Sequence, residues 1–593
     1  MIDALSETLP VLTLAEALAI TDGSAVVVLA DWTPREAAAL ARHASRTDVL
    51  HLPIRFDGAL VLVGPVLRRG VTGCLHCAEK QRLTTARTPR HDPDLLLGGL
   101  PSPALLDGIA ALAESILLTP EPGVVWTLHG GRGTWSRHEI RPVGGCDVCA
   151  PLPDDEPERF ALEPRPLPDP SVLRQPNPRT SLENLRETLH DPVFGPVQHV
   201  YRTEDSVFGL TSALIARGLP LPEGGFGRGA DFHGSERVAL LEALERYAGA
   251  QPTGRRTALR ASFAELGPDK ALDPERLGLP DPAYHGHPSA PTVPYHPDLE
   301  LAWVHGWSLS RDRSVAVPEH VAYWDPPGSA RVVYECSNGC GLGNSPEEAA
   351  LYGLFEIAER DAFLMAWYQR KPLPPVRIPG DLVTSTLVGR AAELGYRVTV
   401  VNATNDFGIP AMVAIARYEG ADQDAPQAFI AAGAHHDPAT AVRSAISELV
   451  SNVGYVTRRA TAEPGWRDLD RLRRMFTEPE LVLTLDDHVG VNTLPEALPR
   501  IEALIADLPE AALAEAPPVH DLTDLLRTTV DRLDLEVVVV RLDEPGARDR
   551  LGLSCVKVIV PGSIPMTFGH VNHRTRGLPR LGGDLFVDPH PFP

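Results

Sequence analysis

The sequence predicts an α/β protein made of two units, and three observations support this prediction. Apolar runs typical of strands alternate with amphipathic segments typical of helices, which is the pattern of strands and helices packed in layers. The chain has 593 residues, which is too long for one ordinary domain. A stretch rich in Pro, Asp and Glu follows residue 150. We therefore expect a first domain at 1–150, a linker at 151–173 and a larger domain at 174–593.

The individual elements follow from the same patterns. Expected strands lie at 25–29, 60–66, 301–304, 398–401, 411–416, 535–540 and 556–560. Expected helices lie at 33–43, 181–189, 382–394 and 439–451, and a further helix follows Pro346.

Composition and charge exclude several classes of function. The chain carries 55 basic and 78 acidic residues, a formal net charge of −23, which disfavours binding to nucleic acid or to an anionic membrane. No apolar run is long enough for a membrane span, and the first residues lack the basic start of a signal peptide, so we expect a cytoplasmic protein. Only four of the basic residues are lysines, and no P-loop motif is present.

Four cysteines form two C-x-x-C pairs, Cys74 with Cys77 and Cys146 with Cys149. In a reducing compartment such pairs indicate a tetrahedral zinc site rather than disulfides. Four thiolate ligands leave no open position for water, so we expect the Zn²⁺ to be structural. The long gap between the pairs requires a folded element between them, and a redox role is the alternative.

The helix after Pro346 is the central element of the larger domain. Ser345 and Glu348 have the spacing of a capping box, and Pro346 suits the first helical position. At about 100° per residue, Glu348, Glu356 and Glu359 fall within an arc of roughly 80° on a helix that is apolar nearly all round. Buried carboxylates are costly unless arginines or a metal ion neutralise them.

A second segment repeats this pattern. Glu242, Glu245 and Arg246 have the same Glu-x-x-Glu-Arg spacing as Glu356, Glu359 and Arg360. Two such helices side by side would bring four carboxylates together, a set of oxygen ligands suited to Mg²⁺ and a polyphosphate. The other interpretation, ordinary charge pairs on two helix surfaces, remains open on spacing alone.

These residues resemble the signatures of the YcaO family. The segment from Ser337-Asn-Gly through Asn344 and Glu348 to Glu356-x-x-Glu359-Arg360 resembles the family's ATP-binding motif, and Glu242-x-x-Glu245-Arg246 resembles its earlier motif. The resemblance covers about residues 170–593. It implies that Glu242, Glu245, Glu356 and Glu359 hold Mg²⁺, and that the ATP site also includes the residues Asn344, Glu348 and Arg360. The family usually has serine where Val238 stands, which puts one hydroxyl contact in doubt.

Two further residues fit the family's phosphate contacts by position. Arg174 and Ser181 have the expected spacing of a basic residue and a hydroxyl, although a linker residue and a helix cap explain them equally well.

The N-terminal part resembles the E1-like, ThiF-derived zinc domain that accompanies YcaO domains. The resemblance rests on Val63-Gly-Pro65 and the two cysteine pairs, and no adenylation loop is visible, so we expect a scaffold. About 21 residues precede the first expected strand, too few for the peptide-binding module seen in the family. This implies a separate partner protein that delivers the leader of a precursor peptide.

The chain ends with Pro589, Pro591 and Pro593 in a Pro-x-Pro-x-Pro pattern, which favours extended polyproline geometry. It matches the terminus typical of YcaO cyclodehydratases, so we expect these prolines to dock beside the reacting amide. A frayed tail is the alternative.

The resemblance implies an ATP-dependent cyclodehydratase. A Cys, Ser or Thr side chain of a ribosomally made peptide attacks the preceding carbonyl, ATP phosphorylates the resulting oxyanion, and phosphate leaves to give a thiazoline or oxazoline. The implied partners are the precursor peptide, the leader-binding protein, an azoline dehydrogenase and a second copy of the chain joined through the YcaO domain. Thioamide formation and a non-catalytic scaffold remain as alternatives.

Overall fold

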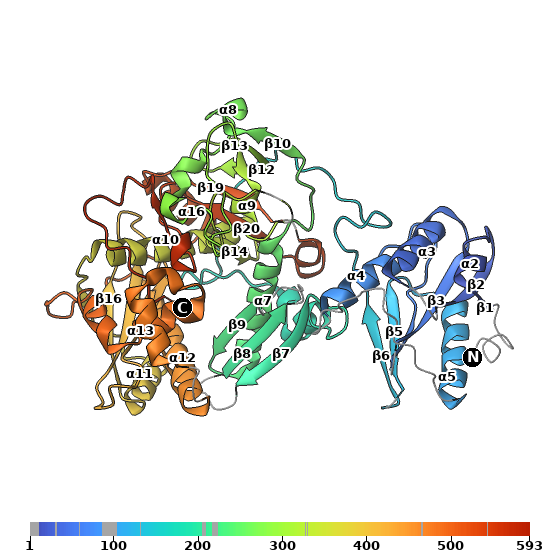
Figure 1. The fold of residues 1–593 in the computed structure, drawn as a ribbon, viewed down its shortest axis with the longest axis horizontal. Coiled ribbons are helices and arrows are strands. Elements are labelled where there is room, and N and C mark those ends of the chain that lie inside the picture. Colours follow the sequence, from blue (N-terminus) through green and yellow to red (C-terminus); the bar gives the residue numbers. More distant parts are fainter. Residues whose placement is uncertain are drawn as a thin grey trace.

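A computed structural model describes two bodies joined along the chain (Figure 1). The described residues are 11–29, 33–57, 60–85, 103–130, 132–203, 209–215, 223–326, 328, 330–463, 467–542 and 544–592. Within these ranges, no helix combines the length and apolar character needed to cross a membrane.

The N-terminal body is one mixed sheet with helices on both faces. Its strand order is β1 (Val11–Leu12), β2 (Ser24–Leu29), β3 (Leu50–Asp57), β4 (Leu60–Val63), β5 (Val124–His129) and β6 (Thr134–Glu139). The first three strands are parallel and the others antiparallel. The helices are α2 (Leu14–Ala17), α3 (Pro34–Arg46), α4 (Leu75–Thr85) and α5 (Pro103–Leu118).

Two features of this body refine the sequence predictions. The expected helix at 33–43 forms as α3, with Thr33 as its N-cap in a complete capping box with Glu36. The first strand is β1 rather than 25–29, because β1 and α2 precede β2. Helices α3 and α4 share one apolar cluster with the sheet, while α5 shares the other, so the sheet is covered on both faces.

The larger body begins with a sheet that the sequence analysis missed. Strands β7 (Val197–Thr203), β8 (Gly209–Ile215) and β9 (Gly224–Gly229) form an antiparallel sheet on which helix α7 (Phe232–Ala250) packs. A β-carbon at Gly225 would lie 2.1 Å from the Ala239 carbonyl oxygen of α7, and one at Gly227 would lie 1.6 Å from the Ser235 carbonyl oxygen. The glycines of β9 therefore let the helix approach the strand closely. Helix α6 (Leu182–Leu189) precedes this sheet.

The next sheet supports the central helix α10 (Pro346–Gln369). Its path is β10 (Leu259–Ser262), β12 (Glu300–Ser308), β19 (Val538–Arg541), β20 (Ser554–Ile559) and β14 (Cys340–Gly343), with β13 (Arg313–Pro318) paired to β12. Gly341 and Gly343 in β14 leave no room for a β-carbon against the backbone of α10. The glycine-rich stretch before the helix is thus a strand that packs closely on it. Short elements nearby are α8 (Phe263–Leu266), α9 (Glu319–Ala322), β11 (Leu279–Pro280) and β21 (Arg574–Arg576).

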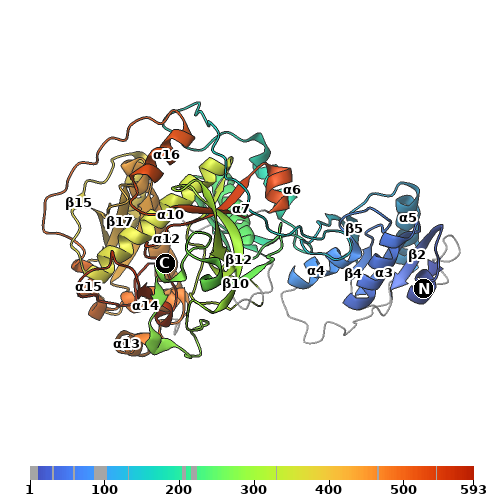
Figure 2. The same cartoon turned by 90° about the horizontal axis from the view of Figure 1, so that it is seen from above.

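Helix α10 also packs on a second antiparallel sheet (Figure 2). This sheet has the order β15 (Pro375–Val376), β16 (Tyr396–Asn402), β17 (Ala411–Tyr418) and β18 (Ala428–Ala434). Val401, Val413 and Ile415 face α10, whereas the alternate residues Val400, Met412 and Ala414 face the other side. On that side lie α11 (Leu382–Glu393) and α12 (Pro438–Ala462).

The remaining helices are α13 (Leu469–Thr477), α14 (Leu485–Asn492), α15 (Leu498–Glu502) and α16 (Leu522–Arg532). The mixed α/β architecture agrees with the predicted fold class. Burial of α10 between two sheets explains why it is apolar nearly all round.

The segment at 151–173, expected as a linker, lies against the larger body. Phe160, Leu167 and Leu173 are buried in the same apolar cluster as α10 and α16. The Arg165 side chain and the Glu163 backbone N–H both donate to the fully buried Glu347 carboxylate, at 2.8 Å and 2.7 Å. This segment therefore holds the N-terminus of α10, and the domain boundaries at 150 and 174 stay a prediction.

Candidate active site

Helices α7 and α10 carry the two Glu-x-x-Glu-Arg motifs toward each other. Each helix begins at a side-chain cap: Asp231 accepts from the Gly234 N–H at 2.6 Å, and Ser345 accepts from the Glu348 N–H at 3.2 Å. Glycine-rich strands hold both helices close to their sheets, as described above. The four motif glutamates are half-buried, so solvent still reaches them.

The two carboxylates on α7 differ in their partners. Glu242 accepts a hydrogen bond from the Phe226 N–H at 2.9 Å and pairs with Arg246 at 2.8 Å. Arg246 pairs in addition with Glu223 at 2.6 Å. Glu245 makes no hydrogen bond or ion pair with any residue that the structure describes. Burial raises the pKa of Glu245 to about 8, and the nearby negative charges of Glu356 and Glu242 add to this shift.

The two motif glutamates on α10, Glu356 and Glu359, also have too few positive partners to balance their charge. Glu356 accepts from the Gly339 N–H at 2.6 Å and pairs with Arg360, yet burial still raises its pKa. Glu359 accepts only the Ala434 N–H, at 3.0 Å, among the described residues. Burial raises the pKa of Glu359 to about 8, and the negative charge of Glu448 on α12 adds to this shift.

These groups form a carboxylate row, defined here as Glu242, Glu245, Glu356 and Glu359. Each member lies close enough to another to repel it, but no three carboxylates of the row have oxygens within 4.8 Å of one another. The row is therefore spread along the site instead of being gathered around one point. Two nearly unpartnered carboxylates with raised pKa values are a natural site for an added cation, and oxygen ligands suit Mg²⁺.

A buried polar network fixes Arg360 next to the row. Arg360 donates to Asn338 Oδ1 at 2.6 Å, and Asn338 donates to Glu335 and to the Met566 carbonyl. Glu335 is in turn paired with Arg574 at 3.0 Å. The two terminal nitrogens of Arg360 are thus held by Asn338 and Glu356, which sets the guanidinium in place before any ligand arrives.

Glu348 has a different role from the one that the capping box predicted. Ser345 does cap the helix, but the Glu348 carboxylate does not return to Ser345. It accepts from Arg174 Nη1 at 3.0 Å, from the Gln175 N–H at 2.9 Å and from Asn344 Nδ2 at 3.0 Å. The cause is the segment before α6. Its Arg174 guanidinium and Gln175 N–H both donate to the Glu348 carboxylate, and two donors, one of them charged, are stronger partners than the single Ser345 N–H of a capping box.

Glu348 thus holds two other predicted ATP-site residues, Arg174 and Asn344. The Arg174 guanidinium also stacks on the Tyr352 ring at 3.6 Å and helps to lower the pKa of Glu245, so it lies within electrostatic reach of the row. Ser181 is exposed and its hydroxyl caps α6 by accepting from the Asn184 N–H at 3.3 Å. Val238 is 45% exposed, one helical turn before Glu242.

The C-terminal segment is buried rather than frayed. Pro589 and Pro591 are buried, and the Pro589 carbonyl accepts from Asn492 at 3.0 Å. The His590 ring stacks on His488 with centroids 4.2 Å apart. Burial lowers the pKa of His590 to about 4, and the charge of Arg360 contributes, so this segment lies within electrostatic reach of Arg360. Pro593 lies outside the described residues.

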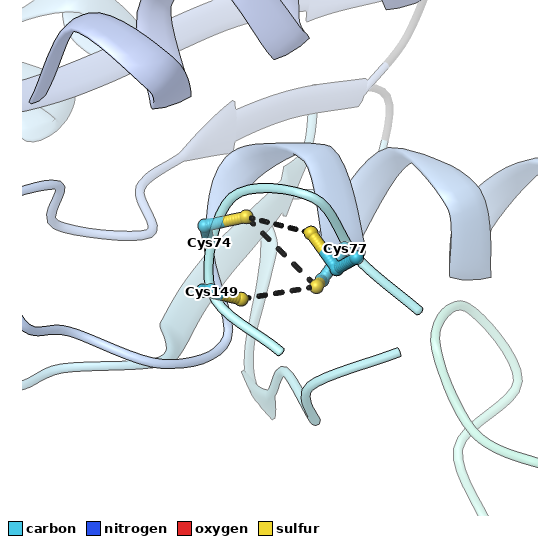
Figure 3. Close-up of side chains that lie close together, drawn as sticks. Cys74, Cys77 and Cys149 are labelled. Carbon is cyan, nitrogen blue, oxygen red and sulfur yellow. Dashed lines mark hydrogen bonds between the residues drawn. The ribbon is translucent and has the colours of Figure 1, made fainter. Parts of the chain in front are cut away.

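The four predicted zinc cysteines converge in the N-terminal body, and Figure 3 labels three of them, Cys74, Cys77 and Cys149. Cys74 precedes α4 and Cys77 lies in it, while Cys146 and Cys149 come from the turn after β6. Their sulfurs lie 3.8 Å apart for Cys74 and Cys77, 3.7 Å for Cys74 and Cys146, and 3.4 Å for Cys77 and Cys149. Helix α5 and strands β5 and β6 form the expected folded element between the two pairs.

This geometry fits a zinc ion. Zn–S bonds of about 2.3 Å in a tetrahedron place the sulfurs about 3.8 Å apart. Hydrogen bonding with the Cys149 sulfur stabilises the protonated thiols of Cys74 and Cys77 and raises the pKa of both, and burial adds to this shift.

Sequence reasoning missed Glu448 and Glu335, and it included Asn338 in the ATP-binding motif without assigning it a role. Glu448 repels Glu359 and pairs loosely with Arg228 of β9 at 3.6 Å, so α12 closes one side of the row. No repeated motif marks Glu448, and its place on the predicted helix 439–451 was the only available signal.

Comparisons with known proteins show the family and the fold of the chain. The family model described as "YcaO cyclodehydratase, ATP- and Mg²⁺-binding" matches residues 226–564, more than half of the chain. An uncharacterized protein of Methanothermobacter thermautotrophicus is 28% identical over 362 residues, which cover 57% of this chain and 80% of that protein. A second relative, an uncharacterized protein encoded in the tfuA 3′ region of Rhizobium leguminosarum bv. trifolii, is 26% identical, covering 44% of this chain and 60% of the relative.

Solved structures show the same fold over the whole chain. A heterocyclase in complex with substrate and cofactor has a TM-score of 0.77 and 21% identity, covering all of this chain and 87% of that one. The heterocyclase TruD has a TM-score of 0.67 and 20% identity, covering 96% and 82%. With both cysteine pairs and both glutamate motifs in place, and with the family model matched across α7 and α10, the chain belongs to the YcaO family.

Proposed function

We propose that this protein is an ATP-dependent cyclodehydratase that converts Cys, Ser or Thr residues of a ribosomally made precursor peptide into azolines. The observation that carries the proposal is the carboxylate row, in which Glu245 and Glu359 have raised pKa values and few partners. A site of this kind stabilises a cation and a polyphosphate, and membership in the YcaO family gives it ATP as the substrate.

The residues of the row would hold Mg²⁺, which when bound neutralises phosphate charge. Arg174 and Arg360 lie within electrostatic reach of the row and would face the phosphates, with Asn344 beside them. Glu348 would act by orienting Arg174 and Asn344, because its fully buried carboxylate accepts a hydrogen bond from each. Ser181 remains a predicted phosphate contact whose hydroxyl already caps a helix.

The reaction needs a leaving group, because an amide oxygen leaves poorly. The peptide side chain attacks the preceding carbonyl, ATP phosphorylates the oxyanion, and phosphate departs with loss of one water equivalent from the peptide. Fixed arginines next to the row favour this step by positioning and by charge neutralisation. The segment with Pro589, Pro591 and Pro593 would lie beside the reacting amide, which the burial of Pro589 and Pro591 near Arg360 supports.

We further propose that Cys74, Cys77, Cys146 and Cys149 bind one structural Zn²⁺. The sulfur distances support it, and four free thiols fit a reducing, cytoplasmic location. The proposed partners are the precursor peptide, a leader-binding protein, an azoline dehydrogenase and a second copy of the chain.

Two other functions remain candidates. A YcaO-type enzyme could form thioamides instead of azolines, in which case sulfur would enter the peptide and change its mass differently. A non-catalytic scaffold would bind peptide and partner but hydrolyse no ATP, and retention of both glutamate motifs argues against it.

The test is reconstitution with the precursor peptide encoded by a neighbouring reading frame and its leader-binding protein. We expect Mg-ATP-dependent loss of one water mass per ring, read by mass spectrometry, together with phosphate release. A gain of sulfur would support thioamide formation, and peptide binding without ATP turnover would support the scaffold.

A further inference from the structure

Asp361 follows Glu359 and Arg360 on α10 and is fully buried, yet it belongs to neither the carboxylate row nor the network around Arg360. Its two oxygens accept four hydrogen bonds. Oδ1 accepts from the Ile564 N–H at 2.8 Å and from Arg580 at 2.7 Å, and Oδ2 accepts from Asn405 at 2.7 Å and from Arg580 at 2.9 Å. The bidentate contact with Arg580 fixes direction as well as distance.

Arg580 begins the segment that leads to the predicted catalytic prolines. Its guanidinium is 12% exposed, pairs in addition with Asp406 and lies over the Phe407 ring at 5.1 Å. Beyond it, the chain runs back along the C-terminal half of α10. The Phe586 N–H donates to the Tyr368 carbonyl at 2.9 Å, and Trp367 Nε1 donates to the Asp588 carbonyl at 3.1 Å.

The far end of this segment is also fixed. The His590 carbonyl accepts from His488 at 3.0 Å, and the Phe592 ring packs on Phe363 at 5.3 Å. Asp588, between these points, pairs with Arg370 at the C-terminus of α10 at 3.0 Å and with Arg500 at 3.1 Å. Residues 586–592 therefore carry polar anchors of their own, and the start of the segment has a separate one. The Asp361–Arg580 pair is the buried, bidentate contact that fixes the start of the segment to α10, next to Glu359 and Arg360.

We propose that Asp361 is a positioning residue: through its bidentate pair with Arg580 it sets residues 580–592 in register along α10, beside Arg360 and the carboxylate row. The expected loss of turnover rests on the proposed function, whereas the expected change in the position of the segment rests on the buried contacts alone. One helix then organises the site twice, with the row on one side and the C-terminal segment on the other.

The experiment compares Asp361→Asn with Asp406→Asn in the full-length protein. Both substitutions remove one negative charge from a partner of Arg580, but Asp406 is mostly exposed and does not contact α10 in this network. For Asp361→Asn we expect turnover of the precursor peptide to fall by roughly tenfold or more at saturating ATP, while the Kd for Mg-ATP stays within about threefold. Asp406→Asn should keep turnover within about threefold of the wild type.

A second readout separates positioning from general stability. In Asp361→Asn, the backbone amides of the non-proline residues of 586–592 should exchange hydrogen faster, whereas amides of β17 should exchange as in the wild type. If Asp361→Asn does not fold, Arg580→Lys takes its place. This variant keeps the positive charge but cannot make the bidentate contact with Asp361, and it should show the same faster local exchange.

The outcomes are distinct. Wild-type exchange in residues 586–592 of the folded variant would overturn the proposal, as would a loss of turnover explained wholly by weaker Mg-ATP binding. If the wild-type protein shows no ATP-dependent water loss, the proposed function fails, but the exchange comparison still decides whether Asp361 sets the segment in place.

Discussion

The two candidate ligand clusters of this protein are built in opposite ways. In the N-terminal body, the four sulfurs of Cys74, Cys77, Cys146 and Cys149 lie within 4.8 Å of one another. In the larger body, the four carboxylates of the row are held apart, each by its own backbone contact or arginine, except for Glu245, which has none among the described residues. One cluster is already closed, and the other is open.

This difference indicates what each cluster is for. A closed tetrahedron of soft ligands leaves nothing for a substrate and joins a helix to a distant turn, which stabilises the fold. In our proposal, an open row of hard ligands would bind a cation that neutralises the carboxylates and would leave coordination positions on that cation for phosphate oxygens. Removing the metal should therefore damage the fold in one body and the chemistry in the other.

The largest expected effect is on the N-terminal body. Cys77→Ser should abolish the predicted one zinc per chain and lower the melting temperature of that body by roughly 10 °C or more, because zinc binding contributes directly to folding. Elemental analysis and calorimetry check this. Cys555→Ser, a buried cysteine of the other body, is the control and should keep its zinc. Full zinc content in Cys77→Ser would contradict the assignment of the four cysteines as zinc ligands.

The next effect is on turnover. Glu245→Gln or Glu359→Gln should lower ATP-dependent turnover by about a hundredfold or more, because each removes a proposed cation ligand. The fold should survive, since neither carboxylate has an ion-pair partner to leave behind. Steady-state kinetics and circular dichroism measure the two quantities. Glu393→Gln, an exposed glutamate on α11, should behave as wild type. Unchanged turnover in both row variants would contradict the assignment.

The same two substitutions should change how the free energy of unfolding depends on pH. The folded pKa of Glu245 and Glu359 is about 8, above the ordinary value of 4.5, so the folded state keeps protons that the unfolded chain releases. The free energy of unfolding without Mg²⁺ should therefore fall as pH rises from about 5 to about 8 and then level off. Urea unfolding at several pH values measures this slope. It should flatten in the double variant, and an unaltered slope would show that these groups do not titrate as described.

The smallest expected effect concerns the one departure from the family motif. Val238→Ser restores the usual hydroxyl on an exposed face of α7, so stability should change by less than about 0.5 kcal/mol. The KM for ATP should change by no more than about threefold. A tenfold change in either direction would mean that position 238 contacts the nucleotide strongly. Kinetics at varied ATP concentration decides this.

Much of the architecture could be predicted from local pattern, and the reasons for the failures are equally local. Helix α10 began where Ser345 and Pro346 predicted, and the cysteines met as their spacing indicated. The sheet of β7, β8 and β9 was missed because β9 reads Gly-Gly-Phe-Gly-Arg-Gly, which has a turn-like composition but packs as a strand under α7.

Contacts between distant segments were beyond the sequence patterns. Nothing near Glu348 indicates that its carboxylate binds Arg174, 174 positions earlier, instead of closing a capping box. The acidic, proline-rich segment at 151–173 reads as a linker by composition, although Phe160 and Leu167 are buried in the core. Asp361 looked like one more charge on a helix until the fold brought Arg580 to it.

The most direct test of the central claim is to locate the cation. Crystals of the zinc-loaded protein soaked with Mn²⁺ and a non-hydrolysable ATP analogue would show the manganese by anomalous scattering. We expect Mn²⁺ to lie between α7 and α10, coordinated by oxygens of the carboxylate row and of the phosphates, and zinc alone to occupy the four cysteines. Manganese and nucleotide bound elsewhere, with Glu245 and Glu359 left without a ligand, would contradict it.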